Sequence, residues 1–173
     1  YTQAYPNAAE YNLLTEGADV QGMYSVYQEG IYLGYRFFET RYEATRSIPA
    51  VFAEFRREFF SCGHAPRCEK HLSSIEKGAA CKRLCMYLRW MVRSDGRGVD
   101  FGEWTRIPMS ALYIPLDVHT GNMSRALGLL TRRQNDWRAV EQTTASLRMF
   151  DPADPVRYDF SLFGAGIDGY LKA

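Results

Sequence analysis

Asp117 and His119 occupy an unusual position, directly after an apolar run and at the start of a helical pattern. Residues 112–130 read LYIPLDVHTGNMSRALGLL, in which the first five residues are typical of a segment entering a core. A carboxylate at this junction has two explanations. It can cap the helix by accepting a hydrogen bond from an amide of the first turn, or it can supply a fixed negative charge for catalysis. Both stay open, because one side chain can serve both purposes.

Basic residues lie on both sides of this segment. Arginine and lysine side chains gathered on one face suit contacts with phosphates, although charged residues on the outer face of a helix are also a usual finding. The residues concerned are Lys77, Lys82, Arg83, Arg89, Arg93, Arg125, Arg132, Arg133 and Arg138. The five between Lys77 and Arg93 lie largely off the apolar stripe of their segment, so we expect them to be exposed.

The residues from Ser47 onward indicate helices that would position these groups. Apolar residues recur at steps of three and four in residues 48–62 and 75–92. Ser73 and Glu76 have the spacing of a capping box and predict a helix start. Further helix starts are predicted at Asn135 and at Asp154, which precedes Pro155. Five helical patterns with short joins predict a mainly α fold, an irregular bundle.

Residues 1–45 differ in composition from the remainder of the chain. They carry two arginines against six carboxylates, a net charge of −4, whereas the remaining residues carry +5. Eight of the twelve tyrosines also fall here. The aromatic stretch around Glu29 and Gly30 is typical of short strands. We therefore predict an irregular or short-strand, Tyr-rich arm and a boundary between Thr45 and Pro49.

Neither a metal nor another cofactor is expected. The spacing of Cys62, Cys68, Cys81 and Cys85 matches no common zinc or iron–sulfur pattern, and the last two lie on an apolar helical stripe. Free thiols and the lack of a secretion signal favour a cytoplasmic protein. No apolar run approaches the roughly 20 residues that a membrane span requires, so no membrane partner is expected.

One stretch near the amino terminus resembles a known enzyme family. YQEGIYLGYRFFETRYE, residues 27–43, is similar to a Tyr-x-Glu-Gly-Ile-x-x-Gly-Tyr-Arg pattern in the later domains of glycoside hydrolase family 3, the β-glucosidase-like enzymes. The resemblance covers residues 9–44. Because the family's catalytic carboxylates lie in parts that this chain does not contain, Glu29 inherits no catalytic role. A carbohydrate hydrolase is the weakest functional hypothesis.

A second resemblance covers residues 52–166. KGAACKRLCMYLRWMVR, IPLDVHTGNMSRALGLLTRRQNDW and FDPADPVRYDFSLFGAGI occur in this order. They resemble the carboxy-terminal half of a bacterial domain-of-unknown-function family, number 2400, which is usually grouped with the helix-hairpin-helix DNA glycosylases. The resemblance implies that residues 46–173 form an incomplete glycosylase-like helical domain.

The glycosylase resemblance implies roles for individual residues. In those enzymes a Val-Asp-x-His motif opens a helix, and its Asp is the catalytic carboxylate. The Asp of this motif corresponds to Asp117 and its His to His119. Lys82 is the best counterpart of the lysine nucleophile that bifunctional members use. Arg83, Arg89, Arg125, Arg132 and Arg133, with His119, would contact double-stranded DNA. The Gly-rich hairpin that grips DNA in that superfamily is missing. Two functions therefore remain: release of a base from DNA, and a non-catalytic helical module that binds DNA or protein.

Overall fold

The computed structural model describes residues 34–168, and this range is mainly helical, which confirms the predicted fold class. Within the described range there is no strand, and the one β contact is an antiparallel bridge between Ala79 and Asp136. The α-helices are α2 (Gly34–Thr45), α3 (Ile48–Phe59), α4 (Lys82–Val92), α5 (Val118–Ala126), α6 (Trp137–Arg148) and α7 (Asp159–Asp168). Short 3₁₀ turns lie at η2 (Pro66–His71), η3 (Met109–Ala111) and η4 (Pro155–Tyr158).

Helix α2 corrects the expectation for the end of the amino-terminal arm. Residues 34–45 were predicted to be strand-like or irregular, but they form a helix that buries Phe37, Phe38 and Tyr42. These aromatic residues suit a strand by composition, yet their spacing of one and four places them on one side of a helix, where they pack against α3. The predicted arm and strand pair at residues 1–33 lie outside the described residues.

The predicted start of the helix at Ser73 is also wrong. Residues 75–78 form a turn, and the Ser74 hydroxyl before it accepts a hydrogen bond from the Lys77 amide at 3.3 Å. Gly78 has a φ of +79° and Cys81 a φ of +48°, and both left-handed conformations interrupt a helix. Helix α4 consequently begins only at Lys82, where the first turn presents Lys82 and Arg83.

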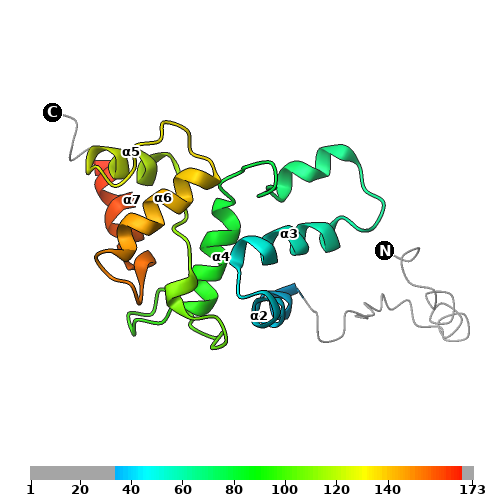
Figure 1. Ribbon diagram of the computed structural model, residues 1–173. Helices are drawn as coiled ribbons and strands as arrows, with labels where there is room; N and C mark the ends of the chain where they lie inside the picture. Colours follow the sequence, from blue (N-terminus) through cyan, green and yellow to red (C-terminus); the bar gives the residue numbers. More distant parts are fainter. Residues whose placement is uncertain (1–33, 169–173) are drawn as a thin grey trace, which may run out of the picture. The chain divides into compact units, whose positions relative to one another are not determined.

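Helix α4 stands between two groups of helices, with α2 and α3 on one side and α5, α6 and α7 on the other (Figure 1). Toward α2, Tyr87 contacts Phe38 with ring centroids 5.7 Å apart. Toward α7, the guanidinium of Arg89 forms an ion pair with Asp159. Helix α4 therefore contacts both groups.

The segment before α5 fixes where that helix begins. Leu112, Ile114 and Leu116 are buried in an extended stretch, and the Ile114 amide donates to the Thr144 hydroxyl of α6 at 3.1 Å. Helices α5 and α7 then pack closely: a Cβ on Gly166 would lie 2.7 Å from the His119 carbonyl oxygen. This close approach places the last turn of α7 against the first turn of α5.

Cys85 is buried in α4 and Cys81 at its N-cap, and burial raises the pKa of Cys81 to about 11, so both cysteines behave as small core side chains.

Between residues 34 and 168, none of the helices combines the length and the hydropathy needed to cross a membrane.

Candidate functional site

Asp117 caps α5, as predicted. Its backbone is extended, with φ −107° and ψ −170°, and its Oδ1 accepts a hydrogen bond from the Thr120 amide at 2.8 Å. An aspartate in this geometry satisfies one of the unpaired amides of the first turn. The cap uses Oδ1 alone, so Oδ2 remains for other interactions.

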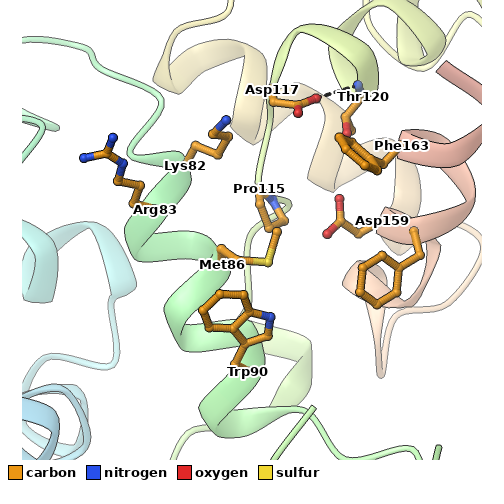
Figure 2. A pocket seen from close by; sticks show the side chains of 10 residues that line it. Lys82, Arg83, Met86, Trp90, Pro115, Asp117, Thr120, Asp159 and Phe163 are labelled. Atoms are coloured by element: carbon orange, nitrogen blue, oxygen red, sulfur yellow. Dashed lines mark hydrogen bonds between the residues drawn. The ribbon is translucent and has the colours of Figure 1, made fainter. Parts of the chain in front are cut away.

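Asp117 and Lys82 line the same pocket, which has a volume of about 390 Å³. In Figure 2 the Lys82 side chain extends from α4 toward the side of the pocket where Asp117 lies, while the Arg83 guanidinium points away from it. The volume falls within the range of small-molecule sites. The pocket is completed by Arg83, Met86, Trp90, Pro115, Thr120, Asp159, Phe160 and Phe163.

The pocket has a charged rim and an aromatic wall. Lys82 and Arg83 are exposed, and among the described residues neither is part of an ion pair. Trp90, Phe160 and Phe163 present partly exposed rings. Cations at a rim can hold phosphates, and aromatic faces can stack on a planar ring. The lining therefore suits a ligand that combines a flat ring with a negatively charged backbone.

Asp159 is a second carboxylate in this pocket, and the sequence did not indicate it. Asp159 is the first residue of α7 and is only 3% exposed, and Arg89 donates to its Oδ2. Burial raises the pKa of Asp159 to about 6, against the opposing effect of the Arg89 guanidinium, and the negative charge of Asp117 adds to the increase. The sequence predicts a helix start at Asp154 and Pro155, whereas α7 begins at Asp159, so the pattern gave Asp159 no special position.

Arg89, predicted to be exposed and to contact DNA, is instead fully buried at 0% exposure. Besides Asp159 it approaches Asp100, at 3.3 Å from Nη2 to Oδ2, and its guanidinium lies 3.9 Å from the centre of the Phe160 ring. Arg89 follows Cys85 by four residues and precedes Val92 by three, so helical spacing places it on the buried stripe. The Arg89 guanidinium pairs with two buried carboxylates, those of Asp100 and Asp159, so Arg89 has a structural role in the core.

Arg93 repeats this arrangement one turn later. It was also expected to be exposed, but it is buried and donates to Asp100 at 2.7 Å, to Asp95 at 2.8 Å and to Asp154 at 2.9 Å. Buried guanidinium groups of this kind persist because their carboxylate partners compensate the lost hydration. Arg93 and Asp154 thereby connect α4 to the segment before η4.

Thr120 brings an unsatisfied hydroxyl to the pocket. The residue is 1% exposed in the first turn of α5, and within the described part of the chain its Oγ1 has no hydrogen-bond partner. Burying a hydroxyl without a partner costs about 1–3 kcal/mol. Thr120 lines the pocket with Asp117 and Asp159, and its hydroxyl oxygen is buried.

The remaining predicted binding residues lie elsewhere. The exposed His119 does not line the pocket, and its ring contacts Phe163 edge-on with centroids 5.7 Å apart. Arg125 donates to the Arg132 and Arg133 carbonyl oxygens at 2.8 and 2.7 Å, which holds the loop between α5 and α6. Arg132 forms an ion pair with Asp136, the N-cap of α6. Arg133 is exposed on the same loop.

No arrangement for a metal ion accompanies the two carboxylates. Across residues 34–168, histidine, cysteine, aspartate and glutamate side chains form no group of three or more that could hold one. The chemistry that this pocket can support comes from an amine, two carboxylates and one hydroxyl, together with stacking on aromatic rings.

The fold and pocket define a mainly helical protein with a lysine and an aspartate brought together at the starts of two helices. Residues 15–168 match the family described as Protein of unknown function (DUF2400), and the chain belongs to this family. No curated protein and no solved structure is significantly similar to the chain. The family match begins at residue 15 and so includes most of residues 9–44, for which a resemblance to glycoside hydrolase family 3 was expected, and none of the comparisons shows that resemblance.

Proposed function

We propose that this chain binds double-stranded DNA and releases a base from it, as an N-glycosylase with lyase capability. The observation that supports this most is that Lys82 and Asp117 line one pocket although they lie on different helices. These two residues are the counterparts of the lysine and carboxylate of the helix-hairpin-helix glycosylases in the resemblance described above. The proposed membership of that superfamily rests on the same two residues.

The lining residues divide the reaction between them. A base must leave the stack to reach such a pocket, and the aromatic rings would receive it. The free amine of Lys82 would form a bond to C1′ of the sugar while the bond from C1′ to the base nitrogen breaks. The base leaves with the bonding electrons and takes up a proton. Opening of the sugar ring and loss of a proton from nitrogen then give a Schiff base.

Asp117 would act on the charge that develops during this step. Breaking an N-glycosidic bond leaves positive charge on the sugar, and an ionised carboxylate that is already fixed in place stabilises that charge. The cap holds Asp117 through Oδ1, so the helix itself fixes the carboxylate. Lys82 and Arg83 at the rim would also contact the phosphates beside the extruded nucleotide.

The experiment compares base release by the wild-type chain, Asp117→Asn and Asp136→Asn on duplexes that carry single damaged bases. Asp136 is a matched control because it caps α6 through a similar hydrogen bond, 3.0 Å from the Ala139 amide, and does not line the pocket. We expect Asp117→Asn to lose activity by about two orders of magnitude or more, and Asp136→Asn to retain most of it. Equal activity of wild type and Asp117→Asn would contradict the assignment.

A non-catalytic helical module is the second candidate. The observation that favours it is that Asp117 already has a structural role as the cap of α5. Salt-dependent binding to DNA without release of any common damaged base would select this module and reject the enzyme. The binding surface would then be tested with Arg83→Ala, because Arg83 is exposed at the rim and lies away from the carboxylates in Figure 2.

A further inference from the structure

Asp159 presents one carboxylate oxygen to the pocket. Its Oδ2 accepts a hydrogen bond from Arg89, whereas its Oδ1 has no hydrogen-bond partner within the described residues. Arg89 is fully buried, so this ion pair holds the carboxylate in place. In Figure 2 the Asp159 carboxylate points into the pocket from α7, on the side opposite the Lys82 side chain of α4. An acidic group in this position can exchange a proton with a molecule in the pocket.

The ion-pair network around Asp159 contains more carboxylates than guanidinium groups. Its two arginines and four aspartates are Arg89, Arg93, Asp95, Asp100, Asp154 and Asp159. Ionisation of all four carboxylates would leave two negative charges without a cation in the network, and neighbouring like charges favour a proton on one of them. Of the six residues, Asp159 lines the pocket and the others do not, so its proton is the one that a bound molecule can reach.

The pKa of Asp159 agrees with this charge count. Burial raises it to about 6, the charges of Asp117 and Asp100 add to the increase, and only Arg89 opposes it. The charged and titratable groups that face Asp159 are Arg89, Cys85 and, across the pocket, Lys82 from α4, Asp117 before α5, and Asp100 from the loop after α4. A carboxyl group with a pKa near neutrality can both hold a proton and give it up, as a general acid must.

We infer that Asp159 is the general acid of the proposed reaction and gives the proton on Oδ1 to the departing base. The inference rests on the proposed function, because it names the source of the proton that the base takes up. The Lys82 amine reaches C1′ from the α4 side, and in a displacement the leaving group departs on the opposite side, where Asp159 lies. Phe160 and Phe163 follow Asp159 in α7 and line the pocket, so a base stacked on them would lie beside this carboxyl.

Electrons and protons balance in this step. The Lys82 nitrogen forms a bond to C1′ while the bond from C1′ to the base nitrogen breaks, and the bonding electrons leave with the base. The proton moves from Asp159 to a nitrogen or oxygen atom of that base, so the base leaves neutral and Asp159 becomes a carboxylate. Arg89 stabilises the carboxylate through its bond to Oδ2. Exchange with water then restores the proton on Asp159.

The experiment compares the wild type, Asp159→Asn and Asp100→Asn in two assays on the intact chain. One assay measures single-turnover base release from duplexes that each carry one neutral damaged base, including uracil and hypoxanthine. The other traps the Schiff base with borohydride on an abasic duplex, where no base needs a proton. Asp159→Asn should slow base release about 100-fold or more. It should leave trapping unchanged, and intact trapping also shows that the variant is folded.

Asp100→Asn is the matched control. It removes a carboxylate from the same Arg89 guanidinium, but Asp100 lies outside the pocket, so both activities should persist. The ratio of the wild-type to the Asp159→Asn rate of base release isolates Asp159, because the other groups cancel. This ratio should fall as the pH rises above about 6, where Asp159 loses its proton. In the Asp100→Asn background the fall should begin at a lower pH, because the charge of Asp100 raises the pKa of Asp159.

The outcomes separate this inference from the proposed function. Slow base release with intact trapping in Asp159→Asn, and a ratio that falls with pH, would support the inference. An active wild type with an equally active Asp159→Asn would overturn the inference alone. Loss of trapping together with base release, or a ratio that does not change with pH, would show a structural role for Asp159 and would also overturn it. A wild type that releases no base from any duplex would refute the proposed function, and the inference with it.

Discussion

At the scale of single residues, the two carboxylates of the pocket differ in how far the sequence could reveal them. Asp117 could be found because a carboxylate between an apolar run and a helical pattern has few explanations, and the structure confirms its cap. Asp159 could not be found, since its significance depends on Arg89 and Asp117, which reach it only through the packing of α4, α5 and α7. The buried position of Arg89 was missed because a charged residue is rarely placed in a core.

Because Asp117 both caps α5 and is proposed to act in catalysis, its substitutions should change stability and activity by different amounts. Asparagine keeps an oxygen for the Thr120 amide, so Asp117→Asn should lower the free energy of unfolding by well under about 1 kcal/mol. Alanine removes the cap, and Asp117→Ala should lower it by about 1 kcal/mol. Urea denaturation of both variants checks this. A similar loss in both would mean that the charge of Asp117, more than its cap, stabilises the fold.

Asp159 predicts a pH dependence of stability with a definite sign. Its pKa of about 6 in the folded chain exceeds the ordinary aspartate pKa of 3.8. The native state therefore binds more protons between these pH values, and this group lowers the free energy of unfolding as the pH rises from 4 to 6. The shift sets an upper limit of about 3 kcal/mol.

The measurement is the difference in unfolding free energy between the wild type and Asp159→Asn across this pH range. Carboxyls with a lowered pKa, such as Asp136 and Asp151, titrate with the opposite sign, but they are present in both proteins and cancel in the difference. The wild type should lose stability relative to Asp159→Asn as the pH rises toward 6. A flat difference would show that Asp159 is ionised throughout.

At the scale of elements, sequence patterns predicted the helices that are capped by the residue directly before them and that have a regular stripe of apolar residues. Helix α3 starts at Ser47 and α5 at Asp117, where each side chain caps its own helix. The start of α4 was predicted too early because Ser73 and Glu76 imitate a capping box. Helix α6 is capped by Asp136, one residue after the predicted Asn135, whose side chain donates instead to the Asp117 carbonyl at 3.1 Å. When two adjacent residues could each cap a helix, only tertiary contacts decide which of them does so.

The close approach of α5 and α7 predicts opposite effects for two glycines of the same helix. Gly164 has open space at its Cβ position, so Gly164→Ala should raise the free energy of unfolding by about 0.5–1 kcal/mol through helix propensity. At Gly166 an added Cβ meets the His119 backbone at 2.7 Å, so Gly166→Ala should lower it by about 1–3 kcal/mol. Thermal unfolding of both variants checks the pair. Equal stabilisation by both would place α7 farther from α5.

At the scale of the whole molecule, packing brings the predicted residues Lys82 and Asp117 to one pocket, which composition and periodicity could not establish. The unit that contains this pocket begins at Gly34 and includes α2. The boundary expected near Thr45 stays a prediction from composition. The family match extends from residue 15 to residue 168 and so continues through that boundary.

The most direct measurement of the proposed chemistry is borohydride trapping on a duplex with a single abasic site, followed by mapping of the modified lysine. Reduction fixes a Schiff base as a stable amine, and among side chains only a lysine amine forms one. Lys82→Ala and Lys82→Arg are compared with Lys77→Ala, whose lysine is exposed, pairs with Glu69 at 3.7 Å and lies outside the pocket. Lys82→Arg keeps the charge and removes the nucleophile.

We predict that the wild type and Lys77→Ala give an adduct that maps to Lys82, and that both Lys82 variants give none. Loss in Lys82→Arg would separate the nucleophile from a phosphate contact, because arginine preserves the positive charge. An adduct that persists in Lys82→Ala, or a wild-type chain that binds the abasic duplex and forms no adduct, would contradict a catalytic role for Lys82.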